Sequence, residues 1–348
     1  MNTKPRKHVI RSWWLVIGAV VIGVIVGEIA YWTLHGTLTN DRDNAHESRP
    51  TTTAPFKTHV VATIPVGRGP EGIALDPQSR RLYTANNDDN TVSVINTETK
   101  TVTATIAVGQ MPRRLALDPS TETLYATNTA GKSVSVIDTR TNTVTATIPL
   151  DSMPFGAAVD GGTHRLYVAA GNVIVIDTTT RTVTKSLPPD DPFEMAVDPG
   201  TATLYVGSAM SPGAVSVIDT VAGSAIRTIP TSDTPWALAV DRGTHTAYFT
   251  YGADTGTVLT MIDAHTRGTV EILVGGRGSQ GIAVDPGNHN VYVTTGNTVA
   301  VVDPSARKVI GTVQVGQNPY GPVLDPGTHT LYTANGRDNT VSVVYLTQ

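Results

Sequence analysis

A single short pattern recurs seven times across residues 59–348, and it constrains the fold more than any other feature of the chain. Each copy has four phrases in a fixed order: P-x-G-x-A-x-D-P, L-Y-x-x-N, T-V-S-V-I-D and V-T-A-T-I. The second phrase supplies one tyrosine per copy, at spacings of 38 to 44 residues: Tyr83, Tyr125, Tyr167, Tyr205, Tyr248, Tyr292 and Tyr332. A period in the low forties with four strand-like phrases is typical of a β-propeller. The pattern therefore predicts an all-β, seven-bladed β-propeller.

The two ends of the repeat region are incomplete in complementary ways. The seventh copy stops at Gln348 without its fourth phrase, whereas a lone fourth phrase, HVVATI, stands at residues 59–64 before the first copy. We expect this N-terminal strand to complete the last blade and close the ring, which leaves no open sheet edge between the termini.

The N-terminal segment predicts a membrane anchor. Residues 13–32 form an apolar run long enough, at 1.5 Å per residue, to cross a bilayer core of about 30 Å, and Trp and Tyr stand at both of its ends. Glu28, the one charge inside, lies near the outer end, where it can reach the headgroups. Residues 1–12 carry four basic and no acidic residues, which predicts a cytoplasmic tail. We expect a single-pass transmembrane signal-anchor helix, with a cleaved signal peptide as the alternative.

The segment that follows is polar and irregular. Residues 33–58 predict a flexible stalk, so the propeller of residues 59–348 is expected on the extracytoplasmic side of the cell membrane. The chain has no cysteine, which excludes disulfides, thiolate catalysis and cysteine-ligated metals.

Charge disfavours nucleic acid as a partner. The formal net charge is −4; without the four basic residues of the tail and the acidic Glu28, and with the stalk balanced, the propeller carries −7. A nucleic-acid binder instead presents a basic surface to the phosphates.

The second phrases, in register, resemble those of the YVTN-family β-propeller repeat proteins. They read LYTAN (82–86), LYATN (124–128), AYFTY (247–251), VYVTT (291–295) and LYTAN (331–335). The resemblance covers residues 59–348 and implies a WD40-like propeller, in a family found largely as secreted or surface-anchored proteins of prokaryotes. Related propellers include binding scaffolds, lactonases and streptogramin-type lyases, so the resemblance implies a fold and a location rather than a reaction.

Most residues that look chemical belong to the repeat and are predicted to be structural. The first phrase ends in an aspartate in all seven copies, which is typical of a turn: Asp76, Asp118, Asp160, Asp198, Asp241, Asp285 and Asp325. Four histidines each precede a repeat tyrosine by three residues: His164, His245, His289 and His329. Each lies in a different blade, so we expect turn residues and not a shared metal site.

Two further motifs have an equally plain interpretation. The loops Gly67–Gly72 and Gly276–Gly281 match G-x-G-x-x-G, but a strand follows each of them where a dinucleotide site needs a helix, so inter-blade turns are predicted. The acidic turns at 86–90 and 335–339 lack the spaced oxygen ligands of a calcium loop. We therefore expect neither a cofactor nor a metal.

The second residue of the first phrase departs from the repeat in every copy. The side chains at this position are Glu71, Arg113, Phe155, Phe193, Trp236, Gln280 and Tyr320, and Arg114 and Glu194 add charge beside them. In a propeller the first strand lines the central channel, and aromatic walls with a few polar groups suit a ligand pocket. We predict a ligand- or partner-binding surface at the channel mouth, with contacts centred on Phe193 and Trp236 under the long loops of blades 4 and 5. The alternative is that these side chains plug the channel and pack between blades.

Two functions follow from this mouth. The first is a non-catalytic, membrane-tethered binding scaffold for a protein, peptide or glycan partner, with a small molecule as a further option, because no catalytic constellation stands out from the repeat. The alternative is an extracytoplasmic lyase- or lactonase-like enzyme, in which Glu71 or Glu194 is the general base and Arg113 holds an anionic group.

Overall fold

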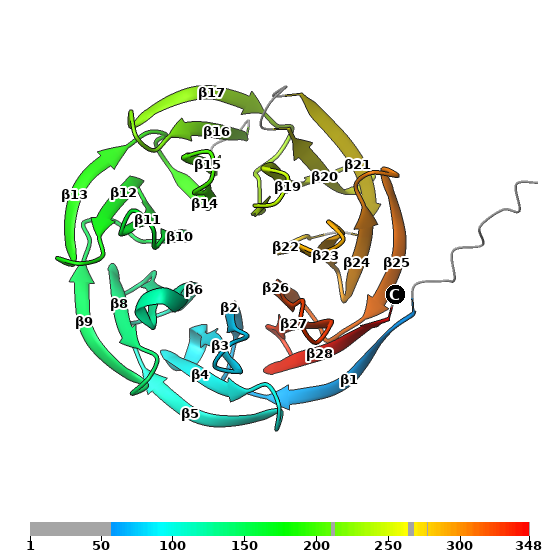
Figure 1. Ribbon diagram of the computed structural model, residues 1–348, viewed down its shortest axis with the longest axis horizontal. Coiled ribbons are helices and arrows are strands. Elements are labelled where there is room, and N and C mark those ends of the chain that lie inside the picture. The colour runs from blue at the N-terminus through cyan, green and yellow to red at the C-terminus, as the bar shows by residue number, and fades with distance from the viewer. Residues whose placement is uncertain (1–56, 210–212, 264–267, 277, 348) are drawn as a thin grey trace, which may run out of the picture. The chain divides into compact units, whose positions relative to one another are not determined.

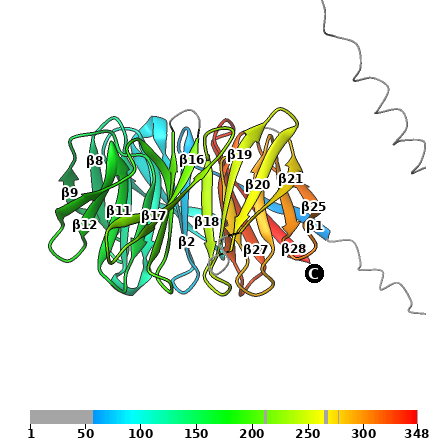
Figure 2. The same ribbon diagram turned by 90° about the horizontal axis from the view of Figure 1, so that it is seen from above.

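The repeat region folds into a closed ring of seven four-stranded antiparallel sheets. The computed structural model describes residues 57–347 except 210–212, 264–267 and 277. The predicted seven blades are confirmed (Figure 1), and a side view shows the strands running between the two faces of the ring (Figure 2). The predicted cytoplasmic tail, the transmembrane helix at 13–32 and the stalk as far as residue 56 fall outside the described residues, whereas Lys57 and Thr58, assigned to the stalk, belong to strand β1. Within the described part, no helix has the length and apolar character needed to cross a membrane.

Each blade contains the four phrases in order, from the centre of the ring outward. Blades 1 and 2 comprise β2 (Pro70–Asp76), β3 (Arg81–Asn86), β4 (Thr91–Asn96), β5 (Thr101–Ala107), β6 (Pro112–Asp118), β7 (Thr123–Asn128), β8 (Ser133–Asp138) and β9 (Thr143–Pro149). Blades 3 and 4 comprise β10 (Ala157–Asp160), β11 (Arg165–Ala170), β12 (Asn172–Asp177), β13 (Thr182–Leu187), β14 (Pro192–Asp198), β15 (Thr203–Ser208), β16 (Ala214–Asp219) and β17 (Ser224–Pro230). Blades 5 and 6 comprise β18 (Ala237–Asp241), β19 (Thr246–Ala253), β20 (Gly256–Ile262), β21 (Thr269–Gly275), β22 (Ile282–Val284), β23 (Val291–Thr295), β24 (Thr298–Asp303) and β25 (Lys308–Gln314). Two 3₁₀ turns, η1 (Asn87–Asp89) and η2 (Pro119–Thr121), interrupt the loops.

The seventh blade is built from both ends of the domain. It comprises β26 (Pro319–Asp325), β27 (Thr330–Asn335), β28 (Thr340–Thr347) and the N-terminal strand β1 (Lys57–Pro65). β1 pairs with β28 from Lys57↔Thr347 to Pro65↔Thr340, with a bulge between Val60 and Ala62. The predicted closing strand is therefore confirmed, and it extends slightly beyond residues 59–64.

The hydrophobic core consists of seven clusters, each lying between two neighbouring blades. At the boundary of blades 7 and 1, for example, Tyr332 packs with Leu82 and Ile95. All seven repeat tyrosines are at most 3% exposed. A blade cannot bury both faces by itself, so the packing of neighbours around a closed ring stabilises the fold.

Blades 1, 2 and 7 match the repeat best, and in each of them the asparagine of the second phrase makes the same two side-chain hydrogen bonds. In blade 1 the buried Asn86 donates from Nδ2 to Thr91 Oγ1 (3.0 Å) and to Ser93 Oγ (2.8 Å) on the next strand. Gly67 packs on this side chain so closely that an added Cβ would lie 2.6 Å from it. The same arrangement recurs in blades 2 and 7. The asparagine of the second phrase therefore links the second strand to the third. It also requires a glycine in the loop that precedes the first strand, because a larger residue there would clash with its side chain.

The repeated aspartates and histidines form turns, as predicted. Asp241, 2% exposed, accepts a hydrogen bond from the Gly243 N–H at 2.9 Å, and the four histidines adopt φ between 49° and 63°. Two histidines also reach an aspartate of the preceding blade, which the sequence did not indicate. His289 Nδ1 lies 2.7 Å from Asp241 Oδ2, and His245 Nδ1 lies 2.8 Å from Asp198 Oδ2.

Candidate functional site

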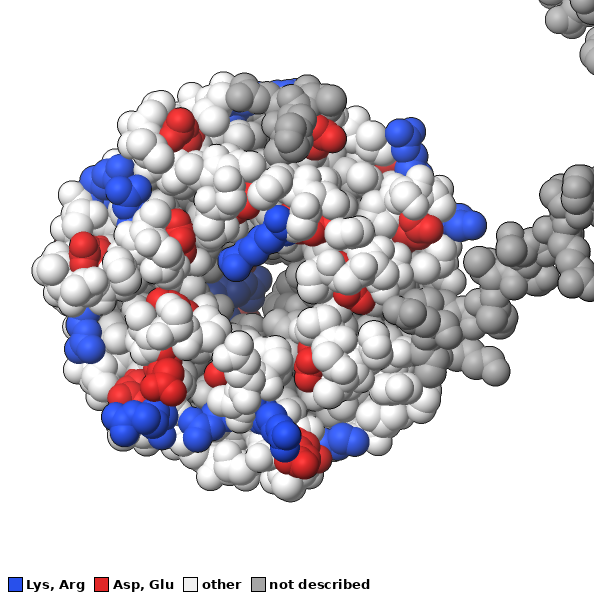
Figure 3. All heavy atoms as spheres, in the orientation of Figure 1, with Lys and Arg blue, Asp and Glu red and all other residues white. Residues whose placement is uncertain are grey.

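The innermost strands surround a central hollow, and basic side chains lie at it (Figure 3). On one face, here called the mouth, the loop before each first strand meets the loop after the second strand. In blade 1 the Asn87 N–H donates to the Gly69 carbonyl at 2.9 Å, and the Asp88 N–H donates to the Arg68 carbonyl at 3.2 Å. The loop that enters the first strand therefore lies beside the loop that joins the second strand to the third.

Neighbouring first strands approach one another closely at the third residue of the first phrase. A Cβ added to Gly72 would lie 2.5 Å from the Arg113 carbonyl oxygen, so a small residue is favoured there. Five blades place Gly or Ala at this position, whereas blades 2 and 4 place Arg114 and Glu194. The Arg114 Nε–H donates to Glu194 Oε1 at 2.5 Å, and the two side chains are 15% and 10% exposed. The sequence shows both charges but does not indicate that they pair, although both replace the small residue found in the other five blades.

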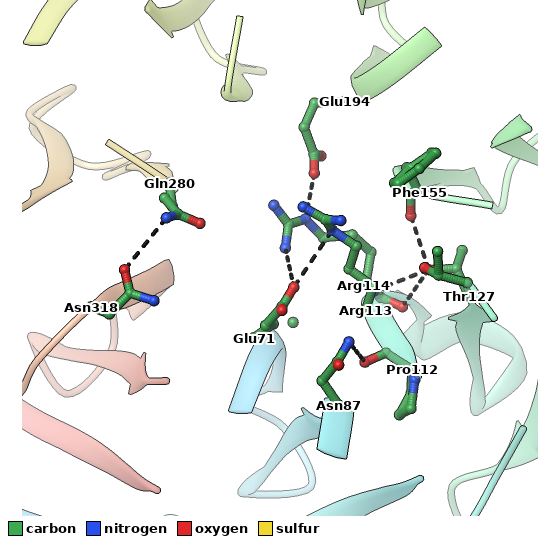
Figure 4. A network of polar contacts seen from close by, with 12 residues as sticks. Glu71, Asn87, Pro112, Arg113, Arg114, Thr127, Phe155, Glu194, Gln280 and Asn318 are labelled. Carbon is green, nitrogen blue, oxygen red and sulfur yellow. Dashed lines mark hydrogen bonds and ion pairs between the residues drawn. The ribbon is translucent and has the colours of Figure 1, made fainter. Parts of the chain in front are cut away.

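Glu71 joins the same cluster through longer contacts. Its Oε2 lies 3.5 Å from Arg113 Nε and 3.9 Å from Arg114 Nη1, and both guanidinium groups lie between Glu71 and Glu194 (Figure 4). These three atoms are buried, and within the described residues none of them makes a hydrogen bond. Burial raises the pKa of the Glu71 carboxyl above its ordinary value; Arg113 and Arg114 act in the opposite direction, and Glu194 adds to the rise.

Three aromatic rings from consecutive blades flank the charges. The Phe155 and Phe193 centroids are 5.4 Å apart, and Trp236 meets Phe193 edge to face at the same separation. The Arg113 guanidinium carbon lies 5.3 Å from the Phe155 centroid and 5.0 Å from that of Phe193, which is cation–π distance. Phe193 is buried, whereas Trp236 is 38% exposed. The rings therefore hold Arg113 in place and present one apolar surface to solvent.

Backbone contacts position these side chains. The buried Thr127 of β7 accepts from the Arg114 N–H at 3.0 Å and donates to the Phe155 carbonyl at 2.9 Å, which links the first strands of blades 2 and 3. Asn87 Nδ2 donates to the Pro112 carbonyl at 3.3 Å and links blade 1 to blade 2 (Figure 4). These hydrogen bonds join blades 1, 2 and 3 to one another beside the charged cluster.

The structure brings six of the eight predicted residues into one sector of the mouth: Glu71, Arg113, Phe155, Phe193, Glu194 and Trp236. Gln280 lies apart and donates from Nε2 to Asn318 Oδ1 at 3.4 Å (Figure 4). The Tyr320 carbonyl accepts from Thr333 Oγ1 at 2.7 Å. Among the described residues, no hydrogen bond or ion pair joins Gln280 or Tyr320 to the charged cluster.

The long loop of blade 5 borders a separate hollow of about 540 Å³. It is lined by Ser232, Asp233, Gly252, Ala253, Asp254, Gly256 and Gly278. Phe193 and Trp236 are not among the residues that line it, and the predicted ligand contacts beside these two rings stay a prediction. In the part of the chain that the structure describes, no group of three or more His, Asp or Glu side chains could hold a metal ion.

Comparison with known proteins supports the propeller. The family described as "Lactonase, 7-bladed beta-propeller" matches residues 44–158, about a third of the chain, which includes Glu71, Arg113, Arg114 and Phe155. No curated protein sequence matches the chain. Hydrazine synthase from Kuenenia stuttgartiensis is similar in structure, with a TM-score of 0.73 over 86% of this chain and 98% of that chain. The identity is 18%, so this likeness concerns the fold alone.

Proposed function

We propose that this protein is a membrane-tethered binding module whose channel mouth holds a protein, peptide or glycan partner through an anionic group. Residues 13–32 are the anchor in this proposal, and the propeller lies on the extracytoplasmic side. The observation that supports the binding role most is the charged cluster of Glu71, Arg113 and Arg114. Three of its buried atoms make no hydrogen bond within the described residues. A buried polar atom left without a hydrogen bond costs about 1–3 kcal/mol, so a ligand that supplies the missing bonds would bind favourably here.

A carboxylate of the partner would replace Glu71 as the counterion of Arg113. The existing contact of 3.5 Å is longer than a hydrogen bond, whereas a guanidinium offers paired donors at about 2.8 Å to an incoming carboxylate. The exposed ring of Trp236 adds apolar contact next to the charge. The mouth therefore favours a ligand that carries an acidic group beside an apolar or aromatic one.

The test is a thermal-stability screen of the full-length protein in detergent, with acidic peptides and acidic sugars against their amidated or neutral counterparts. A ligand at 100 times its dissociation constant adds about 2.7 kcal/mol of stability. We expect an acidic hit that Arg113→Gln abolishes and Trp236→Ala weakens. The control, Arg140→Gln, removes an exposed arginine that pairs with Asp138 in a turn on the other face. A hit that Arg113→Gln binds as tightly as the unmodified protein would rule out this site.

The location is tested separately. Protease added to intact cells should cleave in residues 33–58 and release the propeller, while the N-terminal fragment stays with the membrane. Mature protein that begins after residue 32 would favour the cleaved signal peptide instead. Complete protection from the protease in cells that remain sealed would contradict an extracytoplasmic propeller.

The family match favours a lactonase-like enzyme as a second candidate. Burial raises the pKa of Glu71 above its ordinary value, the direction that favours a carboxyl acting as a general acid or base, and Arg113 is placed to hold an anionic substrate group. The assay is acid release from carboxylate-bearing lactones, followed in a pH-stat. Turnover that survives the double substitution Glu71→Gln and Glu194→Gln would exclude these carboxylates as catalytic groups.

A further inference from the structure

At two blade boundaries the arginine that begins the second strand of one blade is bonded to the next blade. Arg81 begins β3 in blade 1, and its Nη1 donates to the carbonyl oxygen of Thr139, which follows β8 in blade 2. Arg165 begins β11 in blade 3, and its Nη1 donates to the carbonyl oxygen of Thr220 in blade 4 at 2.9 Å. Both contacts lie on the face opposite the mouth, because they join the turn after the first strand of one blade to the turn after the third strand of the next. The threonine carbonyl at this repeat position can thus accept a hydrogen bond from a guanidinium.

The boundary of blades 7 and 1 has the acceptor but lacks the arginine. Thr97 follows β4 at the repeat position of Thr139 and Thr220, while Thr330 begins β27 at the position of Arg81 and Arg165. The Thr330 hydroxyl donates to the nearby Thr328 carbonyl at 3.2 Å instead. Across the described ranges, no donor is bonded to the Thr97 carbonyl oxygen.

A cavity of about 420 Å³ occupies this boundary, and both Thr97 and Thr330 line it. The volume is roughly fourteen times that of a water molecule in the liquid, which is ample for one arginine side chain. β1, the strand by which the chain enters the ring, contributes Val61 to the wall. The cavity, here called the boundary cavity, therefore lies at the position where blades 1 and 3 place a guanidinium against the next blade.

The wall supplies acceptors that suit a guanidinium. Asp325 is 8% exposed and accepts from the Gly327 N–H (3.0 Å) and the Thr328 hydroxyl (2.8 Å), which leaves part of its acceptor capacity unused. Glu98 also lines the cavity and pairs with Arg80 at 2.6 Å. Because Arg80 and Lys100 offset the two carboxylates, recognition depends on directed hydrogen bonds and not on net charge. A planar guanidinium with five donors meets this requirement better than an ammonium.

We infer that the boundary cavity is a receptor for an arginine side chain of a protein partner. The guanidinium would donate to the Thr97 carbonyl, as Arg81 and Arg165 donate at their own boundaries. This site is separate from the mouth and does not depend on the function proposed for it.

The test uses the full-length protein in detergent and N-acetyl-arginine amide as the probe, with N-acetyl-lysine amide as the control, by calorimetric titration. We expect saturable binding of one arginine amide per chain in the millimolar range, and binding of the lysine amide at least tenfold weaker. Thr330→Arg, which places the chain's own guanidinium in the cavity, should weaken arginine-amide binding at least tenfold. The matched variant Thr123→Arg, at the same repeat position in blade 2, should leave it unchanged.

A second variant keeps the test decisive if Thr330→Arg does not fold. Asp325→Asn removes a carboxylate from the cavity wall and keeps an oxygen that can accept from the Gly327 N–H, so it should weaken arginine-amide binding at least tenfold. Equal affinity for the arginine and lysine amides, or no saturable binding to the unmodified protein, overturns the proposal. So does full binding by a folded Thr330→Arg variant or by a folded Asp325→Asn variant.

Discussion

Replacement of Arg114 by methionine should destabilise the propeller by about 3 kcal/mol. The substitution leaves the Glu194 carboxylate, only 10% exposed, without the guanidinium that donates to it at 2.5 Å. Removal of one partner of a buried ion pair costs about 3–5 kcal/mol, and the residual exposure of both side chains favours the lower end. For a domain of this size, 3 kcal/mol corresponds to a fall in Tm of roughly 6–12 °C.

A double-mutant cycle isolates the pair. Replacement of both Arg114 and Glu194 by methionine removes both charges, so the double variant should lie within about 1 kcal/mol of the unmodified protein. Urea unfolding of the full-length protein, followed by far-ultraviolet circular dichroism and by fluorescence, gives the free energies when the two transitions coincide. The reasoning fails if the double variant is as unstable as Arg114→Met, or if Arg114→Met changes stability by less than about 0.5 kcal/mol.

Three further predictions concern the frame of the ring. Deletion of residues 57–65 removes β1, opens one edge of β28 and should cost at least about 3 kcal/mol; unchanged melting of the shortened protein would refute closure by this strand. Burial alone would raise the pKa of Asp241, but hydrogen bonds from the Gly243 N–H and from His289 outweigh it, so the pKa is lowered from its ordinary 3.8. The stabilisation is therefore present above pH 3.8 and lost as the pH falls below it, and Asp241→Asn should flatten the acid fall in Tm; an identical acid limb would contradict this. Gly109→Ala should cost about 1–3 kcal/mol, because its Cβ would lie 2.6 Å from a buried asparagine. The control Gly162→Ala, whose Cβ meets nothing nearer than a carboxylate oxygen at 3.4 Å, should be neutral, and equal effects of the two changes on Tm would remove the steric explanation.

The sequence predicted the ring because its signal is repeated seven times. A tyrosine that recurs every 38 to 44 residues also fixes the order of the blades, so the contact of Phe155, Phe193 and Trp236 could be expected from consecutive blades 3, 4 and 5. The same order could not show that Arg114 and Glu194 meet, since blade 3 separates them in sequence. Their contact depends on how tightly the first strands converge at the axis.

The histidine contacts show a second feature that could not be predicted from the sequence. The repeat identifies His289 as a turn residue, and its positive φ agrees. Its bond to Asp241 depends on how far one blade is offset from the next along the ring axis, and no single-blade pattern carries that offset. Contacts within a blade were therefore predictable, whereas most contacts between blades required the structure.

The pairing of β1 with β28 also has a consequence for how the protein is made. About 275 residues separate Pro65 from its partner Thr340, so β1 is synthesised long before the strand that completes its sheet. At roughly 5–20 residues per second, that interval is about 14–55 s. During it the apolar side of β1 has no final partner, and the first strand of one nascent chain can pair with the last strand of another. When many ribosomes translate one messenger RNA close together, dimers that have exchanged β1 should therefore form. When the ribosomes are far apart, the closed monomer should form.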